Sequence, residues 1–348
     1  MSDRPVHAPL QQFPVVDDAL MVGGMTVAQL VAQVGTTPFY AYDREAMTRR
    51  MSQLRTALPD GLSIHYAVKA NPMPAVVDHM AGLADGLDVA SLGELKLALD
   101  TQTDAGDISF AGPGKDEREL RAAVAAGITL NLESSGELRR AIRVGETLGI
   151  TPRVAVRVNP DFELKSSGMK MSGGAKPFGI DVEQVPAVLD RIGGAGLHFR
   201  GFQIFSGSQN LRAERLIEAQ NATFDLAARL AEDAPAAVEV LNIGGGFGIP
   251  YFPGDRPLDL HAIGDNLASR VQECRQRLGG ADVIVELGRH LVGEAGIYVC
   301  EVLDKKTSRG VTYLVTDGGL HHHLAASGNF GQIVRKNFPL YAAHRVFG

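Results

Sequence analysis

The chain lacks several features that would assign it to a particular class of protein. It has only two cysteines, Cys274 and Cys300, which argues against a disulfide scaffold and fits a reducing compartment. It has no basic block and a net charge of −6, which argues against nucleic acid or an anionic membrane as a partner. No basic segment followed by an apolar run opens the sequence, and no apolar run is long enough to span a bilayer. We therefore expect a soluble, cytoplasmic protein.

What the chain does have is a regular alternation of strands and helices. Its 348 residues can form one large domain with an appendage, or two domains. Amphipathic stretches at 116–126, 136–148, 182–192, 212–232 and 260–278 separate most of the apolar, β-branched runs. These runs predict strands at 64–69, 87–90, 108–111, 128–132, 153–158, 199–205, 238–243 and 283–287. Eight such strands predict a (β/α)₈ barrel; an open doubly wound sheet is the alternative, but no early G-x-G-x-x-G motif supports it.

The pattern changes after residue 287. Residues 296–304 and 311–316 read as strands joined by a turn at 308–310, with no helix between them, which predicts antiparallel β structure. The early strand at 38–42 is a candidate member of the same sheet. We expect an N-terminal segment at 1–43 that partly joins this β domain, a barrel at 44–290, and a β domain at 291–348 that is incomplete.

Lys69 is the first candidate catalytic residue, because it ends the first strand of the predicted barrel. Catalytic groups collect at the carboxyl ends of such strands. Partial desolvation there would lower the pKa of the amine and prepare it for Schiff-base chemistry. The alternative is a lysine that caps the strand with its ammonium in water.

Other polar or flexible residues follow the remaining strands. Three consecutive glycines, Gly244 to Gly246, let backbone N–H groups converge on an anion such as a phosphate. The ordinary alternative for these glycines is a tight turn, and the alternative for the run 286–289 is an ion pair at the rim. Together they predict a pocket that contains an amine, an anion cradle and a carboxylate; its further members are Asp88, Arg157, Ser208, Glu286, Gly288 and Arg289.

Several short motifs in order give the chain a family resemblance over about residues 25–345. The runs 66–71, 88–95, 244–248 and 286–289 resemble the alanine-racemase-like (fold type III) pyridoxal-phosphate decarboxylases, which act on diaminopimelate, ornithine or arginine. The runs 157–160, 178–180, 205–210, 317–320 and 325–330 look most like the branch associated with exosortase-A systems.

The resemblance implies a role for each matching position. Lys69 would carry pyridoxal 5'-phosphate as a Schiff base, and Glu286 would face the pyridine nitrogen. The cofactor would be held by Asp88, Arg157, Ser208, Gly244, Gly245, Gly246, Gly288 and Arg289. A carboxylate at the ring nitrogen keeps the ring protonated and favours decarboxylation, whereas racemases of this fold place an arginine there.

The resemblance also implies a substrate and a partner. Arg289, Arg335 and Tyr341 would meet the distal group of the substrate, and an arginine favours a second carboxylate, as in diaminopimelate. Family members share their active sites across a homodimer. Two alternatives stay open, an amino-acid racemase on the same fold and a non-catalytic homologue that binds partners.

The sequence departs from the family at two places. Phe205 stands where these decarboxylases usually have a histidine that stacks on the cofactor. The cysteine and the tyrosine that the family's C-terminal domain supplies are not visible. We expect no metal site, since adjacent side chains in the run His321-His322-His323 would point to opposite faces of a strand.

Overall fold

The computed structural model describes residues 11–162, 169–170, 173–319, 321–323 and 340–343. The chain forms two compact units. One consists of Thr48–Ile249 and Pro257–Gly293, and the other of Met1–Met47, Pro250–Arg256 and Glu294–Gly348.

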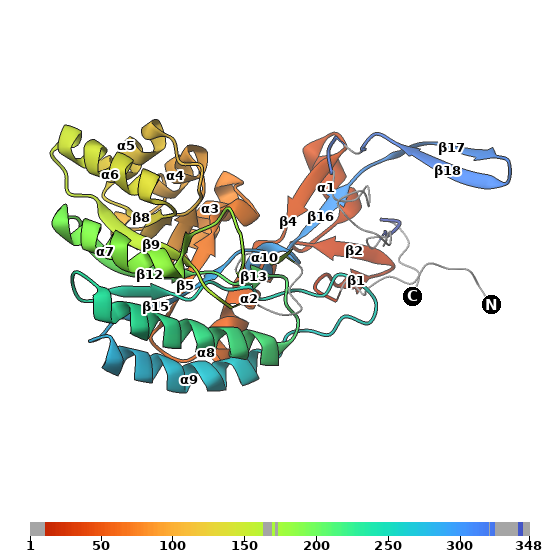
Figure 1. Ribbon diagram of the computed structural model, residues 1–348. Helices are drawn as coiled ribbons and strands as arrows, with labels where there is room; N and C mark the ends of the chain where they lie inside the picture. The colour runs from red at the N-terminus through yellow and green to blue at the C-terminus, as the bar shows by residue number, and fades with distance from the viewer. Residues whose placement is uncertain (1–10, 163–168, 171–172, 320, 324–339, 344–348) are drawn as a thin grey trace. The chain divides into compact units, whose positions relative to one another are not determined.

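The larger unit is a closed barrel of eight parallel strands, which confirms the predicted (β/α)₈ fold (Figure 1). The ring closes where the last strand pairs with the first, with Val285 opposite Ile64 and Glu286 opposite His65. In ring order the strands are β5 (Leu62–Ala67), β6 (Gly86–Val89), β7 (Ile108–Phe110), β8 (Thr129–Leu132), β9 (Arg153–Asn159), β12 (His198–Ile204), β14 (Val240–Asn242) and β15 (Asp282–Leu287).

The barrel strands are buried on both faces, as parallel strands covered by helices must be. Leu87, Phe110, Val154, Phe202 and Val285 are fully buried. Continuous apolar runs therefore mark these strands in the sequence, and the predicted bounds lie within two residues of the observed ones.

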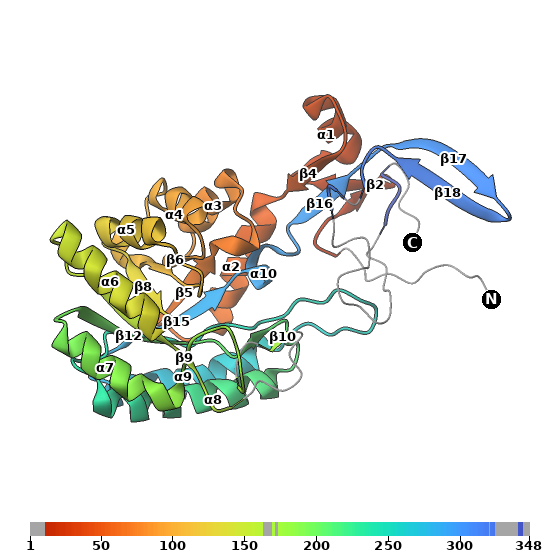
Figure 2. The same cartoon turned by 45° about the horizontal axis from the view of Figure 1, so that its top comes forward.

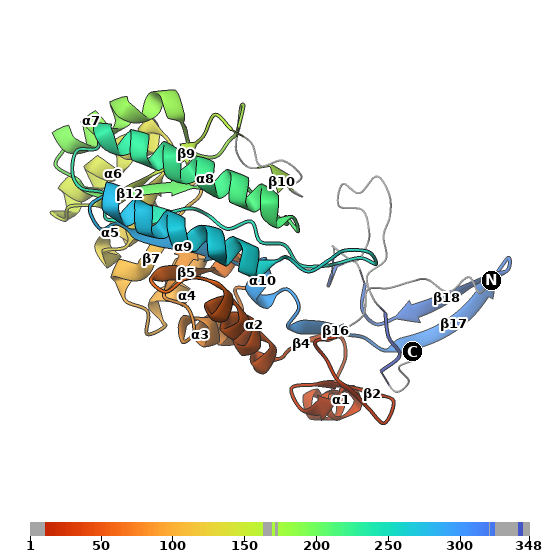
Figure 3. The same cartoon turned by 90° about the horizontal axis from the view of Figure 1, so that it is seen from below.

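Helices surround the barrel, and α8 and α9 lie side by side on its outside (Figures 2 and 3). Many of them begin at a side-chain cap: Ser91 caps α4, Asp116 caps α5 and Ser134 caps α6. Because Ser91 and Ser134 closely follow β6 and β8, the residues before each cap lie at the carboxyl rim of the barrel. The helices are α3 (Pro74–Ala81), α4 (Leu92–Leu99), α5 (Glu117–Ala126), α6 (Ser135–Leu148), α7 (Val185–Gly194), α8 (Ala213–Leu230) and α9 (Leu260–Arg277).

The smaller unit contains antiparallel β structure, as predicted. The expected strand at 296–304 is instead two strands, β16 (Gly296–Val299) and β17 (Val302–Ser308). β16 pairs with β4 (Phe39–Tyr42), so the early strand does join this β structure, whereas β17 forms a hairpin with β18 (Val311–Thr316). The strand breaks between β16 and β17 because the two have different pairing partners.

The remaining elements of the smaller unit are short. They are β1 (Val15–Val16), β2 (Ala19–Val22), β3 (Met25–Thr26) and α1 (Val27–Val34), and α2 (Arg44–Ala57) begins in this unit and continues into the larger one. Phe13, Leu20, Val22, Val27 and Val299 form the buried core of this unit. No helix in the described part of the chain combines the length and the apolar composition needed to cross a bilayer.

Candidate active site

Lys69 lies in a single 3₁₀ turn, Val68–Ala70, directly after β5. Its Nζ donates a hydrogen bond of 2.7 Å to Oε1 of Glu286, which lies near the end of the neighbouring strand β15. The lysine side chain is 53% exposed, whereas the glutamate side chain is only 6% exposed. An accessible amine therefore rests on a buried carboxylate at the rim of the barrel.

The charges of this pair determine each other's pKa. Burial alone would lower the pKa of Lys69, but the charge and the hydrogen bond of Glu286 outweigh it, and the pKa is raised. The sequence-based expectation of a lowered pKa is therefore wrong for this arrangement. Burial would likewise raise the pKa of Glu286, but the charge of Lys69 and the hydrogen bond from it lower that pKa.

Glu286 is held from two further directions. Its backbone N–H donates to the carbonyl oxygen of Gly244 at 2.9 Å, which ties the carboxylate strand to the glycine loop. Its Oε2 accepts a hydrogen bond of 2.9 Å from Nε2 of Gln203, a residue of β12 that is 1% exposed. The carboxylate is therefore bonded through both oxygens.

The glycine loop lies against the loop that contains Ser208. The backbone N–H of Asn210 donates to the Gly246 carbonyl at 2.9 Å, and that of Gly248 donates back to the Asn210 carbonyl at 2.9 Å. Gly246 has a φ of +86°, and a Cβ there would come within 2.6 Å of the Gly207 carbonyl oxygen. Only glycine permits this approach, so the two loops that were predicted to hold a phosphate are brought together.

Phe205, which stands where the family usually has a histidine, lies at the same loops. A Cβ on Gly244 would lie 2.6 Å from Cδ2 of Phe205 and 3.0 Å from the carbonyl oxygen of Ile204. The half-buried Phe205 ring is thus packed directly against the glycine loop.

Arg157 and Asp88 are buried at the ends of their strands, as the strand assignment predicted. Arg157 Nη1 donates to Oε1 of Glu133 at 2.7 Å, and its charge acts on the pKa of both Lys69 and Glu286. Asp88 accepts a hydrogen bond from Ser109 and has His65 Nδ1 3.5 Å from its Oδ2. Asp88 is therefore engaged by neighbours in the barrel interior, and its charge contributes to the raised pKa of Lys69.

Gly288, predicted to hold the cofactor, and the residues predicted to meet substrate, Arg289, Arg335 and Tyr341, are less closely grouped. Gly288 precedes the short helix α10 (Arg289–Val292), and a Cβ on it would lie 2.8 Å from that of Ala70, beside Lys69. Arg289 Nη1 lies 3.4 Å from Oε1 of Gln209. Tyr341 belongs to the smaller unit, and Arg335 lies outside the described residues, so their predicted roles stay predictions.

Gln203 is the residue of this site that sequence reasoning missed. It stands between Phe202 and Ile204, both fully buried, in a strand that is otherwise apolar at its C-terminal end. A lone amide in such a run was the available signal, because a buried polar side chain needs a partner.

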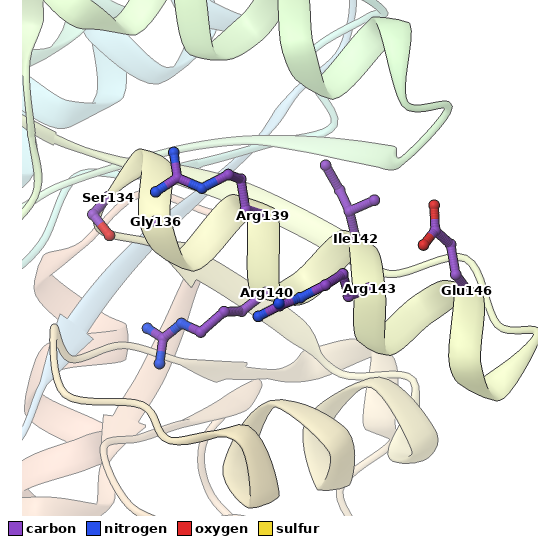
Figure 4. Close-up of a pocket in the computed structure, with 7 residues that line it drawn as sticks. All are labelled: Ser134, Gly136, Arg139, Arg140, Ile142, Arg143 and Glu146. Carbon is purple, nitrogen blue, oxygen red and sulfur yellow. The ribbon is translucent and has the colours of Figure 1, made fainter.

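A second feature lies on the outer face of α6. A cavity of about 600 Å³ is lined by Ser134, Gly136, Arg139, Arg140, Ile142, Arg143 and Glu146. Figure 4 shows the three guanidinium groups directed toward the N-terminal end of the helix, which follows β8 at the rim. Arg140 donates to the Lys115 carbonyl, and within the described residues neither Arg139 nor Arg143 forms a salt bridge.

Comparison with known proteins links this geometry to a family. The family model "Pyridoxal-dependent decarboxylase, pyridoxal binding domain" matches residues 44–293. The chain is 37% identical over 307 residues to the L-glutamyl-(BtrI acyl-carrier protein) decarboxylase of Niallia circulans, covering 87% of this chain and 72% of that protein. It is 33% identical over 308 residues to the diaminopimelate decarboxylase of Aquifex aeolicus, covering 88% and 71%.

A solved structure agrees with these relatives. Diaminopimelate decarboxylase from M. jannaschii in complex with L-lysine superposes with a TM-score of 0.79 at 27% identity, covering 89% of this chain and 74% of that one.

The residues present fit a pyridoxal phosphate group. An accessible amine suits its aldehyde, a buried carboxylate suits its ring nitrogen, and a glycine loop packed closely against the Ser208 loop suits its phosphate. All three features lie in the unit that the family model matches.

Proposed function

Because this chain belongs to the pyridoxal-dependent decarboxylases and is an amino-acid decarboxylase that uses pyridoxal phosphate, we propose that Lys69, Glu286 and the glycine loop are its reacting and binding groups. The observation that carries the proposal is the 2.7 Å contact between the exposed Lys69 amine and the buried Glu286 carboxylate.

The cofactor supplies an electron sink for the pair released when the bond between Cα and the carboxylate breaks. Lys69 would hold the cofactor through Nζ, which must first release a proton to solvent and leave Glu286. Once the substrate amine has replaced it, the freed Nζ would take up a proton again and deliver it to the α-carbon after CO₂ has left. Glu286 would remain ionised and hold the proton of the ring nitrogen in place.

A charged Glu286 separates decarboxylation from racemisation on this fold. Lys69 and Arg157 both lower its pKa, so it carries a negative charge at neutral pH. A negative group beside the ring nitrogen strengthens the electron sink, which the loss of CO₂ needs.

The substrate that we propose is an amino acid with a second polar end, similar to diaminopimelate. Relatives with this activity share 29–33% of their residues with the chain. The test is the absorbance of the purified holoenzyme before and after each amino acid is added, with release of CO₂ measured in parallel. A higher kcat/KM for ornithine or lysine than for diaminopimelate would contradict this assignment.

A second candidate substrate is an aminoacyl group held on an acyl-carrier protein. The relative from Niallia circulans is named for such a substrate, and the arginines of α6 form a positive face on a chain whose net charge is −6. Positive charge at the rim would steer an acidic partner toward the barrel mouth.

This candidate predicts that turnover of a carrier-bound aminoacyl group falls steeply with ionic strength, while turnover of the free amino acid does not. Arg139→Glu with Arg143→Glu should lower kcat/KM for the carrier-bound form only. Arg229→Glu, on the exposed last turn of α8, is the matched control. No turnover of a carrier-bound glutamyl group by the wild-type enzyme would dismiss the candidate.

We also propose that the chain acts as a homodimer. Support comes from the family resemblance and from the apolar side chains that the hairpin β17–β18 exposes; Leu303 is 63% and Leu314 is 62% exposed. Light scattering after size exclusion should give twice the mass of one chain, and a monomer at micromolar concentration would contradict the proposal.

A further inference from the structure

We propose that Gln203 is a positioning residue that keeps Glu286 ionised and in one orientation, so that the ring nitrogen of bound cofactor retains its proton. This inference rests on the proposed function. Gln203 would not touch the reacting atoms itself and would act on them through Glu286.

The contact is built into the barrel. Gln203 pairs in register with Arg157 on β9 and with Asn242 on β14. Glu286 belongs to β15, on the far side of β14, so the two side chains meet across the barrel interior rather than along one ladder. Both residues are buried, and their positions are therefore determined by the packing of the barrel.

The two oxygens of Glu286 have different donors. Oε1 accepts from Lys69, and Oε2 accepts from Gln203. Lys69 must leave this position to react, so its hydrogen bond is temporary. Of the two side-chain donors found in the described residues, Gln203 is the one that stays with Glu286 through the reaction.

The orientation of the amide follows from charge. Nε2 faces the carboxylate, and the opposite orientation would place two oxygens with partial or full negative charge in contact. Within the described residues Oε1 of Gln203 has no hydrogen-bond partner although it is buried. The amide is thus anchored by Glu286 and not by a competing group.

The effect on the cofactor follows from sharing one proton between two groups. A donor on the carboxylate stabilises its charge and lowers its pKa, as the hydrogen bond from Gln203 does for Glu286. The shared proton then stays on the ring nitrogen. Without this donor the pKa of Glu286 rises, the proton moves toward the carboxylate, and the ring becomes a weaker electron sink.

The test compares variants of the holoenzyme. Gln203→Leu and Gln203→Met remove the donor and keep an apolar side chain of similar size, whereas Gln203→His restores an N–H at the same place. Gln220→Leu is the matched control, because Gln220 is a buried glutamine of α8 outside the barrel. The readouts are the ¹⁵N chemical shift of ring-labelled pyridoxal phosphate against pH, its dissociation constant, and kcat.

We expect Gln203→Leu and Gln203→Met to bind cofactor on Lys69 but to lose ring protonation at a lower pH than the wild type. Their kcat should fall about 10- to 100-fold, the range for a hydrogen bond to a charged group. Gln203→His should recover most of both losses, and Gln220→Leu should show neither.

Unchanged ring protonation and kcat in the variant that folds, Leu or Met, would overturn the proposal. A fall in kcat with unchanged ring protonation would overturn it too, because it would indicate a packing role. Failure of the wild-type chain to bind pyridoxal phosphate would instead contradict the proposed function.

Discussion

Two lysine–glutamate pairs in the barrel unit have nearly the same separation and different surroundings. Lys69 Nζ lies 2.7 Å from Glu286, and Lys115 Nζ lies 2.6 Å from Glu137. The Lys69 side chain is 53% exposed, whereas those of Lys115 and Glu137 are each 1% exposed. The distance between the charges alone does not distinguish a reactive pair from a structural one.

The number of acceptors does distinguish them. Lys115 donates to the carbonyls of Gly112 and Asn131 at 2.8 and 2.9 Å in addition to Glu137, which uses all three ammonium protons. Within the described residues Glu286 is the one hydrogen-bond partner of Lys69. A lysine with protons to spare and access to solvent can leave its partner and react, and Lys115 cannot.

The largest effect that follows from this comparison is the loss of reaction in Lys69→Ala. The variant should form no borohydride-trapped cofactor adduct and should lose decarboxylation by orders of magnitude. Its free energy of unfolding should fall by less than that of Lys115→Met, because Lys69 is half exposed and water can take its place beside Glu286, which keeps its hydrogen bond from Gln203. Mass spectrometry of the reduced protein locates the adduct, and an adduct that persists on another lysine would rule out this role for Lys69.

The opposite result is expected for Lys115→Met, which leaves the Glu137 carboxylate buried without its cation. Breaking a buried pair costs about 3–5 kcal/mol of unfolding free energy, measured by urea denaturation. Lys96→Met, at an exposed position on α4, is the control. Adding Glu137→Leu should restore most of the loss, and a Lys115→Met variant as stable as the control would show that the pair is not structural.

The barrel, and the strand ends at which the candidate site residues stand, could be predicted from the sequence because their signals are local. Buried parallel strands read as apolar runs, and strand ends locate Lys69, Glu286 and the glycine loop. The raised pKa of Lys69 could not be predicted, because it depends on a residue 217 positions away.

The other features that could not be predicted also depend on contacts between distant segments. Gln203 meets Glu286 across the barrel, and that contact depends on the strand register, which no local pattern contains. The break between β16 and β17 depends on which strand each one pairs with. Local chemistry predicts which elements form, whereas contacts between distant segments decide their partners.

Glu286→Gln tests the comparison between the two lysine–glutamate pairs by changing the carboxylate instead of the lysine. It keeps the size and shape of the side chain but removes the charge and one of the two acceptor oxygens. Cofactor should still bind while decarboxylation falls a few hundredfold, about 3–4 kcal/mol of transition-state stabilisation. Glu137→Gln should instead lower stability and leave kcat of the folded enzyme unchanged. Stopped-flow measurement at saturating substrate checks the first, and an unchanged rate would show that the ring nitrogen does not need this carboxylate.

The smallest expected effect concerns two buried histidines. It tests whether a neighbouring carboxylate also determines the direction in which the pKa of a buried histidine shifts. His65 and His290 are both buried, but among the residues that the structure describes only His65 has a carboxylate beside it, that of Asp88. Burial would lower the pKa of His65, but the nearby carboxylate of Asp88, 3.5 Å from its Nδ1, outweighs burial and raises that pKa. Burial, with the charge of Arg50, lowers the pKa of His290 to about 4, against an opposing hydrogen bond to the Gly248 carbonyl.

A histidine whose pKa is lower in the folded state stabilises the fold above its unfolded pKa of 6.5, and that stability is lost as pH falls toward 4. We therefore expect the free energy of unfolding to drop by on the order of 1–3 kcal/mol across this range because of His290. His290→Gln should remove that part of the pH dependence, whereas His261→Gln, at an exposed position on α9, should not. Urea denaturation at several pH values measures the slopes, and equal slopes for wild type and His290→Gln would mean that His290 does not resist protonation and that burial without an acid is not enough.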